Sequence, residues 1–335
     1  MWLQLIDFLD AWPWKEERQM ALDYTRSHLE QSWPHRWRQG FHLWEQSSLG
    51  WEFMDRADQR ISSLPQAREV WCPPGSFQVH RRPSDSSSTE DEPMLTVQQP
   101  RGLWAMTTPV TEEMWHSVPL PPNLRSFIHN EGRDAHQDQC PITALTWLQM
   151  VVFCNEVSRR EGLEEAYEIV WPEVLPQAHQ QELWHTETNV FFAGTESSGY
   201  RLPTELEWEV LARAGCVKDH YEEPSDTSWH SENSGGHIHP VGLKKPNAWG
   251  LFDTVGNVYE RCTDTSPDES MFPDWTAQQS TSTVRCQSSD LFVAERGGSY
   301  GCDQHMCNLW ARDYVLRYTS DRYTGFRMVR TCTKD

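Results

Sequence analysis

The chain has 335 residues, enough for one large domain or two ordinary domains with a hydrophobic core. Its 29 Lys and Arg residues against 49 Asp and Glu residues give a formal net charge of −20. A surface of this charge repels the phosphates of nucleic acids and the head groups of anionic lipids, so we expect neither nucleic acid nor a membrane as a partner.

The cysteines and the first residues favour a cytoplasmic protein. Nine cysteines, an odd number without a dense framework spacing and without a Cys-x-x-Cys pair, fit a reducing compartment better than a disulfide scaffold or a structural zinc site. The opening MWLQLIDFLD lacks a basic region and carries Asp7 and Asp10, unlike a secretory signal. No apolar run is long enough for a transmembrane helix.

Residues 1–68 predict a small helical module. Leu3, Ile6 and Leu9 recur at helical spacing, and a second helical stretch is expected up to Ile61. Trp33-Pro34 separates the two stretches, because the residue before a proline avoids the α region. No catalytic motif is found here, and we expect the module to dock another protein.

The composition changes after residue 68. Pro73, Pro74 and Gly75 open a region of short strands and turns, in which RRPSDSSSTEDEP (81–93) predicts an exposed loop. Residues 101–118 predict a strand that leads into a short helix, with Thr111 as its N-cap.

Two later helices have clear start signals. Thr146 with Gln149, and Thr204 with Glu207, each form the pattern of a capping box. Gly215 supplies the expected end of the second helix. Beyond it, short apolar pairs alternate with Gly, Asn, Ser, Pro and Trp, and irregular segments of this length are usually functional or braced by ligands, metals or packing.

Several stretches, in this order along the chain, resemble one family. They include RLPTELEWE (201–209), NAWGLFDTVGNVYE (247–260), and RGGSY (296–300) followed by GFR (325–327). In combination they resemble the formylglycine-generating enzyme, or sulfatase-modifying factor, family over about residues 70–330. The resemblance implies an α+β domain with a C-type lectin-like fold and much irregular structure. We therefore predict this domain over residues 69–335, behind the helical module of residues 1–68.

The stretch DTVGNVYE resembles the calcium loop of that family. The resemblance implies that Asp253 and Glu260 supply carboxylates and that Gly256 and Val258 supply backbone carbonyls. Calcium prefers six to eight oxygen ligands, and a tight Gly-Asn turn can direct such groups to one point. The alternative is that the two acidic side chains only cap turns.

The cysteines after RGGSY match another family site. In members that oxidise a sulfatase cysteine to formylglycine, two cysteines at the positions of Cys302 and Cys307 bind copper(I), and a serine at the position of Ser299 is part of the active site. Paired soft thiolates suit copper(I). The alternative is that both cysteines are small buried hydrophobic residues.

The segment 300–324 also has the composition of a binding surface, because tyrosine, aspartate and arginine on loops are typical of interfaces. The predicted contact residues are Tyr300, Asp303, His305, Trp310, Asp313, Tyr314, Arg317, Tyr318, Asp321, Arg322 and Tyr323. The segment resembles the mutable region of variable proteins from diversity-generating retroelements. We interpret the chain as a ligand- or protein-binding module, with a copper-dependent formylglycine-generating oxidase as the alternative.

Overall fold

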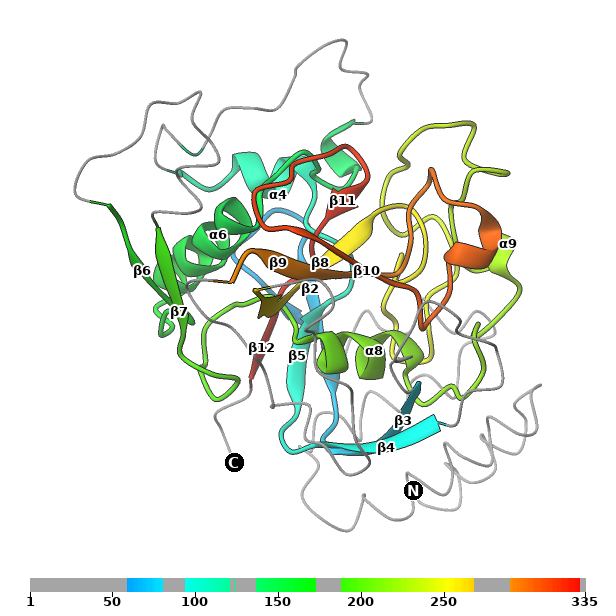
Figure 1. The fold of residues 1–335 in the computed structure, drawn as a ribbon, viewed down its shortest axis with the longest axis horizontal. Coiled ribbons are helices and arrows are strands. Elements are labelled where there is room, and N and C mark those ends of the chain that lie inside the picture. The colour runs from blue at the N-terminus through cyan, green and yellow to red at the C-terminus, as the bar shows by residue number, and fades with distance from the viewer. Residues whose placement is uncertain are drawn as a thin grey trace.

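A computed structural model describes residues 59–80, 94–120, 124, 137–172, 188–267 and 290–331 (Figure 1). Most of the predicted helical module and the predicted exposed loop 81–93 lie outside these residues. Within the described parts of the chain, no helix is long and apolar enough to cross a membrane.

The described strands form two four-stranded sheets and two ribbons. The first sheet has the order β1 (Gln59–Ile61), β2 (Arg68–Cys72), β5 (Leu103–Met106) and β12 (Val329–Thr331), with antiparallel neighbours. The second has the order β10 (Arg312–Leu316), β9 (Phe292–Arg296), β8 (Tyr259–Ser266) and β11 (Thr324–Gly325), and β11 runs parallel to β8. The ribbons are β3 (Gly75–His80) with β4 (Met94–Gln99), and β6 (Tyr167–Val170) with β7 (Asn189–Phe192).

Among the described residues, three α-helices begin where the sequence predicts, whereas a short fourth α-helix and the 3-10 helices are not predicted from the sequence. The α-helices are α4 (Glu112–His116), α6 (Trp147–Arg160), α8 (Glu205–Arg213) and the short α9 (Pro224–Thr227), and the 3-10 helices are η1 (Gln137–Gln139) and η3 (Gln304–Met306). The hydroxyls of Thr111, Thr146 and Thr204 cap α4, α6 and α8. Helix α8 ends at Arg213, two residues before the predicted glycine, because its C-cap Ala214 already has a φ of 46°.

The predicted helical stretch up to Ile61 is wrong at its end, because residues 59–61 form strand β1. A turn through Ser62 and Pro65 reverses the chain, and β1 then pairs antiparallel with β2. Leu64, only 2% exposed, belongs to the main core, and Ser62 Oγ donates to Glu161 at 2.8 Å. Residues 59–68 therefore belong to the sheet and its core rather than to a helical module.

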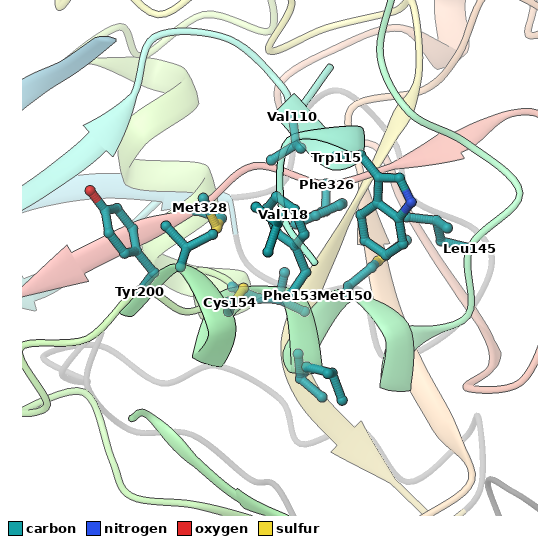
Figure 2. Packing of buried hydrophobic residues seen from close by; sticks show 14 of the residues in the cluster. Val110, Trp115, Val118, Leu145, Met150, Phe153, Cys154, Tyr200, Phe326 and Met328 are labelled. Atoms are coloured by element: carbon teal, nitrogen blue, oxygen red, sulfur yellow. The ribbon is translucent and has the colours of Figure 1, made fainter. Parts of the chain in front are cut away.

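Aromatic residues from three separate segments meet in the core under α6. The rings of Trp115 and Phe153 stack with centroids 5.0 Å apart, and Phe326 meets Phe153 edge-on at 5.7 Å (Figure 2). Phe326 lies between β11 and β12, so the last described segment completes the core as well as both sheets.

The second sheet presents two chemically different faces. The register places Glu260, Arg296 and Arg312 in one row, with Arg296 paired to Glu205 and Glu209 of α8. The next row holds Arg261, Glu295 and Asp313, whose side chains point to the opposite face because strand residues alternate. Tyr259 shares this second face, and the candidate site begins beside it.

Candidate functional site

A tight glycine turn shapes the loop that follows β9. Gly297 and Gly298 both adopt positive φ, 93° and 76°. A Cβ at Gly298 would lie 2.9 Å from Cys307 Sγ and 2.7 Å from the carbonyl oxygen of Met306. Because such distances are too short for a side chain, glycine is required for residues 299–307 to fold back over this turn.

Ser299 brings the two cysteines of the loop together. Its hydroxyl lies 3.3 Å from Cys302 Sγ, and its backbone carbonyl accepts a hydrogen bond from Cys307 Sγ at 3.5 Å. Cys302 Sγ also donates to the hydroxyl of Tyr259 at 3.2 Å. The structure thus brings Ser299, Cys302 and Cys307 into one cluster, and it adds Tyr259 from β8.

The two thiols differ in exposure. Cys307 is fully buried, whereas Cys302 is partly exposed. Burial, with a further contribution from Cys302, raises the pKa of Cys307 to about 12, so its thiol is protonated at neutral pH. Burial also raises the pKa of Tyr259 well above its usual value, and the contact with Cys302 adds to that shift.

A pair of tyrosines lies next to the thiols. The rings of Tyr300 and Tyr323 are 5.1 Å apart, and Tyr323 fills the space beside Gly301, where a Cβ would approach its ring to 2.6 Å. We call the surface formed by Cys302, Asp303, Asp321, Arg322 and Tyr323, together with the buried Tyr300 that packs against Tyr323, the tyrosine surface.

The backbone of the tyrosine surface is fixed by contacts with other loops. Ser231 N donates to the carbonyl of Cys302 at 2.8 Å, and Ser234 Oγ donates to the carbonyl of Tyr300 at 2.9 Å. Tyr259 N donates to the carbonyl of Tyr323 at 2.8 Å. Figure 1 shows the orange segment after β9 beside the yellow-green loop that contains residues 228–239.

The predicted contact residues do not form one surface. Asp303, His305 and Asp313 are exposed, and Trp310, Tyr314, Tyr318, Asp321 and Tyr323 are partly exposed. Tyr300 and Arg317 are buried, which corrects the expectation that both face a ligand. Tyr314 is turned toward α8, where its hydroxyl donates to Glu205 at 3.4 Å. Trp310 lies beside His80, with ring centroids 6.2 Å apart, outside the tyrosine surface.

Sequence reasoning missed Tyr259, Ser231 and Ser234. Tyr259 had a detectable signal, because strand alternation places it on the face opposite to its neighbour Glu260. Ser231 and Ser234 had none, since their role depends on contacts with residues about 70 positions away in the sequence, as the Ser234–Tyr300 bond shows with its separation of 66.

The predicted calcium ligands fit a metal only in part. Asp253 is buried, Gly242 N donates to its Oδ2 at 2.7 Å, and its Oδ1 accepts no hydrogen bond from the described residues. Burial is the largest influence on this carboxyl and raises its pKa to about 6. Glu260, in contrast, forms an ion pair with the Arg327 guanidinium at 2.7 Å and accepts a hydrogen bond from Trp208 Nε1 at 2.8 Å. A buried guanidinium therefore already neutralises Glu260.

The backbone of the loop follows the predicted tight turn. Gly256 has a φ of 70°, and a Cβ there would lie 2.4 Å from the carbonyl of Trp229. Val258 is buried at 1% exposure, directly before β8. No group of three or more His, Cys, Asp or Glu side chains placed to hold a metal ion occurs in the described parts of the chain. Calcium binding stays a prediction that depends on Asp253 and backbone carbonyls.

The chain resembles a known family and several known proteins. A family model described as "Sulfatase-modifying factor enzyme 1-like domain" matches residues 56–332. A formylglycine-generating enzyme from Thermomonospora curvata is 30% identical over 166 residues, which cover 43% of this chain and 53% of that enzyme. The Paenibacillus barcinonensis "Chaperone protein LppX" is 27% identical over 178 residues, covering 46% of this chain and 59% of that protein. The matches therefore span only about half the length of these relatives.

Solved structures share the fold. Treponema denticola variable protein 1 superposes with a TM-score of 0.62 at 22% identity, covering 82% of this chain and 99% of that one. PvdO from Pseudomonas aeruginosa gives a TM-score of 0.55 at 18% identity, covering 81% of this chain and 100% of that one. The predicted C-type lectin-like α+β fold with much irregular structure is thereby confirmed.

Proposed function

The chain belongs to the family of sulfatase-modifying factor enzyme 1-like domains, and we propose that it is a binding member of this family that holds a peptide or protein ligand on the tyrosine surface. The observation that carries the proposal is the combination of solvent-facing side chains with a fixed backbone. Asp303 and the partly exposed Tyr323 stand on loops held by Ser231 and Tyr259. The backbone of these loops is already ordered in the free protein. Binding of a ligand to aromatic side chains on such loops therefore costs less conformational entropy.

In the free protein, the contacts of the two thiols do not favour a reactive thiolate. A thiolate is stabilised by a neighbouring cation or by a bound metal. The pKa of the buried Cys307 is raised to about 12, with burial as the main cause. The contacts of Cys302 are the hydroxyls of Ser299 and Tyr259, which carry no positive charge.

The experiment selects peptides from a displayed random library on the whole protein and measures the dissociation constants of the selected peptides. Tyr323→Ala should weaken them at least about tenfold, because truncating an aromatic anchor removes a central contact. Phe191→Ala is the matched control, since Phe191 is 48% exposed on β7, outside the tyrosine surface. Equal affinities of the Tyr323 and Phe191 variants would contradict the proposal.

One fold neighbour is a variable protein, and diversification of residues 300–324 is part of the proposal. Sequencing this segment in many isolates should show substitutions at exposed positions such as Asp303 and His305. The buried Cys307, Leu309 and Arg317 should stay constant, because they pack inside the domain. Variation spread evenly over exposed and buried positions would contradict diversification for binding.

A copper-dependent formylglycine-generating oxidase is the second candidate, favoured by the contact of both cysteines with Ser299. The donor set fits copper(I), which prefers two thiolates, and bound copper would supply oxygen activation. Cys302 and Cys307 would hold it. Stoichiometric copper(I) binding that is lost in Cys302→Ala, with aldehyde formation on a Cys-x-Pro-x-Arg peptide, would establish this enzyme. Absence of aldehyde would exclude it.

A further inference from the structure

The tyrosine surface carries an unequal set of charges. Residues 299–323 contain Asp303, Asp313 and Asp321 among three arginines. Arg312 is paired with Glu205 and Glu209, and Arg317 is buried, so within this segment Arg322 alone presents a guanidinium to solvent. Of these aspartates, Asp303 and Asp321 belong to the tyrosine surface, so two carboxylates accompany one exposed guanidinium there, and a cationic ligand complements this charge.

Arg322 lies on the tyrosine ring itself. Its guanidinium carbon is 5.0 Å from the centroid of the Tyr323 ring, and its Nη2 donates to the Tyr323 hydroxyl at 2.8 Å. Asp321 stands beside this contact, since its Oδ1 accepts from Tyr323 N at 2.8 Å. Burial raises the pKa of Tyr300, and the charges of Arg322 and Asp321 both act on the same phenol. A guanidinium, a carboxylate and two rings thus form one cluster.

The ring is fixed but the arginine is exposed. Tyr323 is held against Gly301 and by its backbone bond to Asp321, so it cannot turn away without disturbing the loop. Arg322 extends into solvent and has a flexible stem, and exposed cation–π contacts and ion pairs are weak. A second guanidinium can therefore replace Arg322 at small cost.

From this geometry we infer that the Tyr323 ring, backed by Tyr300 and with Asp321 beside it, binds the side chain of an arginine in a peptide ligand, and that Arg322 occupies this place in the free protein as an internal competitor. Arginine suits the place because its planar guanidinium stacks on a ring and donates to a carboxylate at the same time. The inference rests on the proposed function and adds the chemistry of the ligand.

The test uses the whole protein and two short peptides, acetyl-Gly-Gly-Arg-Gly-Gly-amide and the same peptide with citrulline, which keeps the shape and removes the charge. Ligand-observed NMR titration gives the dissociation constants. Arg322→Gln should tighten binding of the arginine peptide about twofold to fivefold, since the competing contact is weak. The citrulline peptide should bind about twofold to fivefold more weakly, because it cannot form the exposed ion pair with Asp321.

Three variants separate competition from charge. Arg160→Gln is the matched control, because Arg160 is an exposed arginine on α6 and its loss changes the net charge equally. Arg322→Lys keeps the local charge but not the planar group, and it should fall between the wild type and Arg322→Gln. Tyr323→Leu, made in the Arg322→Gln background, should abolish the gain, whereas Tyr323→Phe should keep most of it.

Equal binding of the two peptides, or an Arg322→Gln variant no tighter than Arg160→Gln, would overturn the inference. The proposed function fails in a different way. If library-selected peptides still depend on Tyr323 while the arginine peptide binds no variant, the surface binds ligands but arginine is not its ligand. If no selected peptide depends on Tyr323, the proposed function itself is wrong.

Discussion

Cys302 and Cys307 are five positions apart but lie in different surroundings. The side chain of Cys302 is partly exposed and contacts two hydroxyl groups, whereas Cys307 is enclosed beneath Gly298. The enclosure follows from the glycine turn, because the turn packs Cys307 directly against the backbone of Gly298. A sequence spacing alone does not distinguish these two positions.

We predict that iodoacetamide modifies Cys302 and leaves Cys307 unmodified in the folded protein. At pH 8 a thiol with a pKa of about 12 is deprotonated in only about one molecule in ten thousand, and Cys307 is also closed to the reagent. Mass spectrometry of proteolytic peptides checks the result, with urea-unfolded protein as the control in which both cysteines react. Equal labelling of the two positions in the folded protein would show that the loop opens.

Asp253 predicts a pH dependence of stability. Its pKa rises from an ordinary value near 3.9 in the unfolded chain to about 6 in the folded protein. The folded state therefore binds a proton more tightly, and stability falls as the pH rises from about 4 to about 6. The loss amounts to at most about 3 kcal/mol, from about 1.4 kcal/mol for each pKa unit. Asp253→Asn should remove it and raise stability at pH 8 in the presence of a chelator.

Urea unfolding of both proteins at pH 5 and pH 8 measures the effect. The two proteins should differ more at pH 8 than at pH 5, and an equal difference at both values would contradict the titration of Asp253. Adding calcium tests the separate prediction of a metal site. If Asp253 is a calcium ligand, the wild type gains stability by mass action and the variant does not, so the lead of the variant at pH 8 shrinks as calcium is added.

At the scale of elements, helix α8 is bound to the second sheet by buried ion pairs. Glu209 accepts from Arg213 at 2.8 Å and also pairs with Arg296 and Arg312, and all of these side chains are largely buried. The three arginines lower the pKa of Glu209 to about 2 in spite of its burial. Removing one member of such a group leaves uncompensated charge in the interior.

Glu209→Gln should therefore cost about 3–5 kcal/mol of the free energy of unfolding. Glu156→Gln is the matched control, because Glu156 pairs on α6 with Arg159, whose side chain is 54% exposed, and such surface pairs contribute less than about 1 kcal/mol. The pKa of Glu209 is lowered, so its contribution is present above about pH 4 and disappears as the pH falls toward 2. Urea unfolding at pH 7 measures both variants, and similar losses would contradict the role of the ion pairs.

The sequence predicts local structure better than these long-range contacts. The caps of α6 and α8 are legible because each capping box spans only four residues. The ion-pair partners of Glu209 cannot be read from the sequence, since Arg296 and Arg312 lie 87 and 103 positions away. The proximity of Ser299, Cys302 and Cys307 could be predicted from one loop. The burial of Tyr300 and Arg317 could not, because both residue types occur at surfaces and in cores.

At the scale of the whole molecule, the family match and the sheet agree on where the domain starts. The match begins at residue 56 and β1 at Gln59, ahead of the boundary at residue 68 expected from the sequence. The described residues before Arg68 supply an edge strand and the core residue Leu64. Residues 1–55 stay a predicted separate module.

We predict that a shortened chain starting at Arg56 folds and that one starting at Arg68 is less stable by about 2–5 kcal/mol, comparable to the loss of a large core side chain. The shorter chain lacks β1, Leu64 and the bond from Ser62 to Glu161. Urea unfolding compares the two chains. Equal stabilities would show that residues 56–67 contribute nothing, and failure of the longer chain to fold would contradict a separable module.

Residues 324–331 hold β11, Phe326 and β12, and Arg327 donates to the carbonyl of Met106 at 2.8 Å and pairs with Glu260. Both sheets therefore need a segment that a ribosome makes after almost everything else described here. At about 5–20 residues per second, synthesis up to residue 331 takes roughly 15–70 s. During that time most side chains of the core have been synthesised, but they stay exposed to water because β11, Phe326 and β12 are still missing. In the described parts of the chain, neither sheet can be completed before residues 324–331 are made, and the core stays open on that side until then.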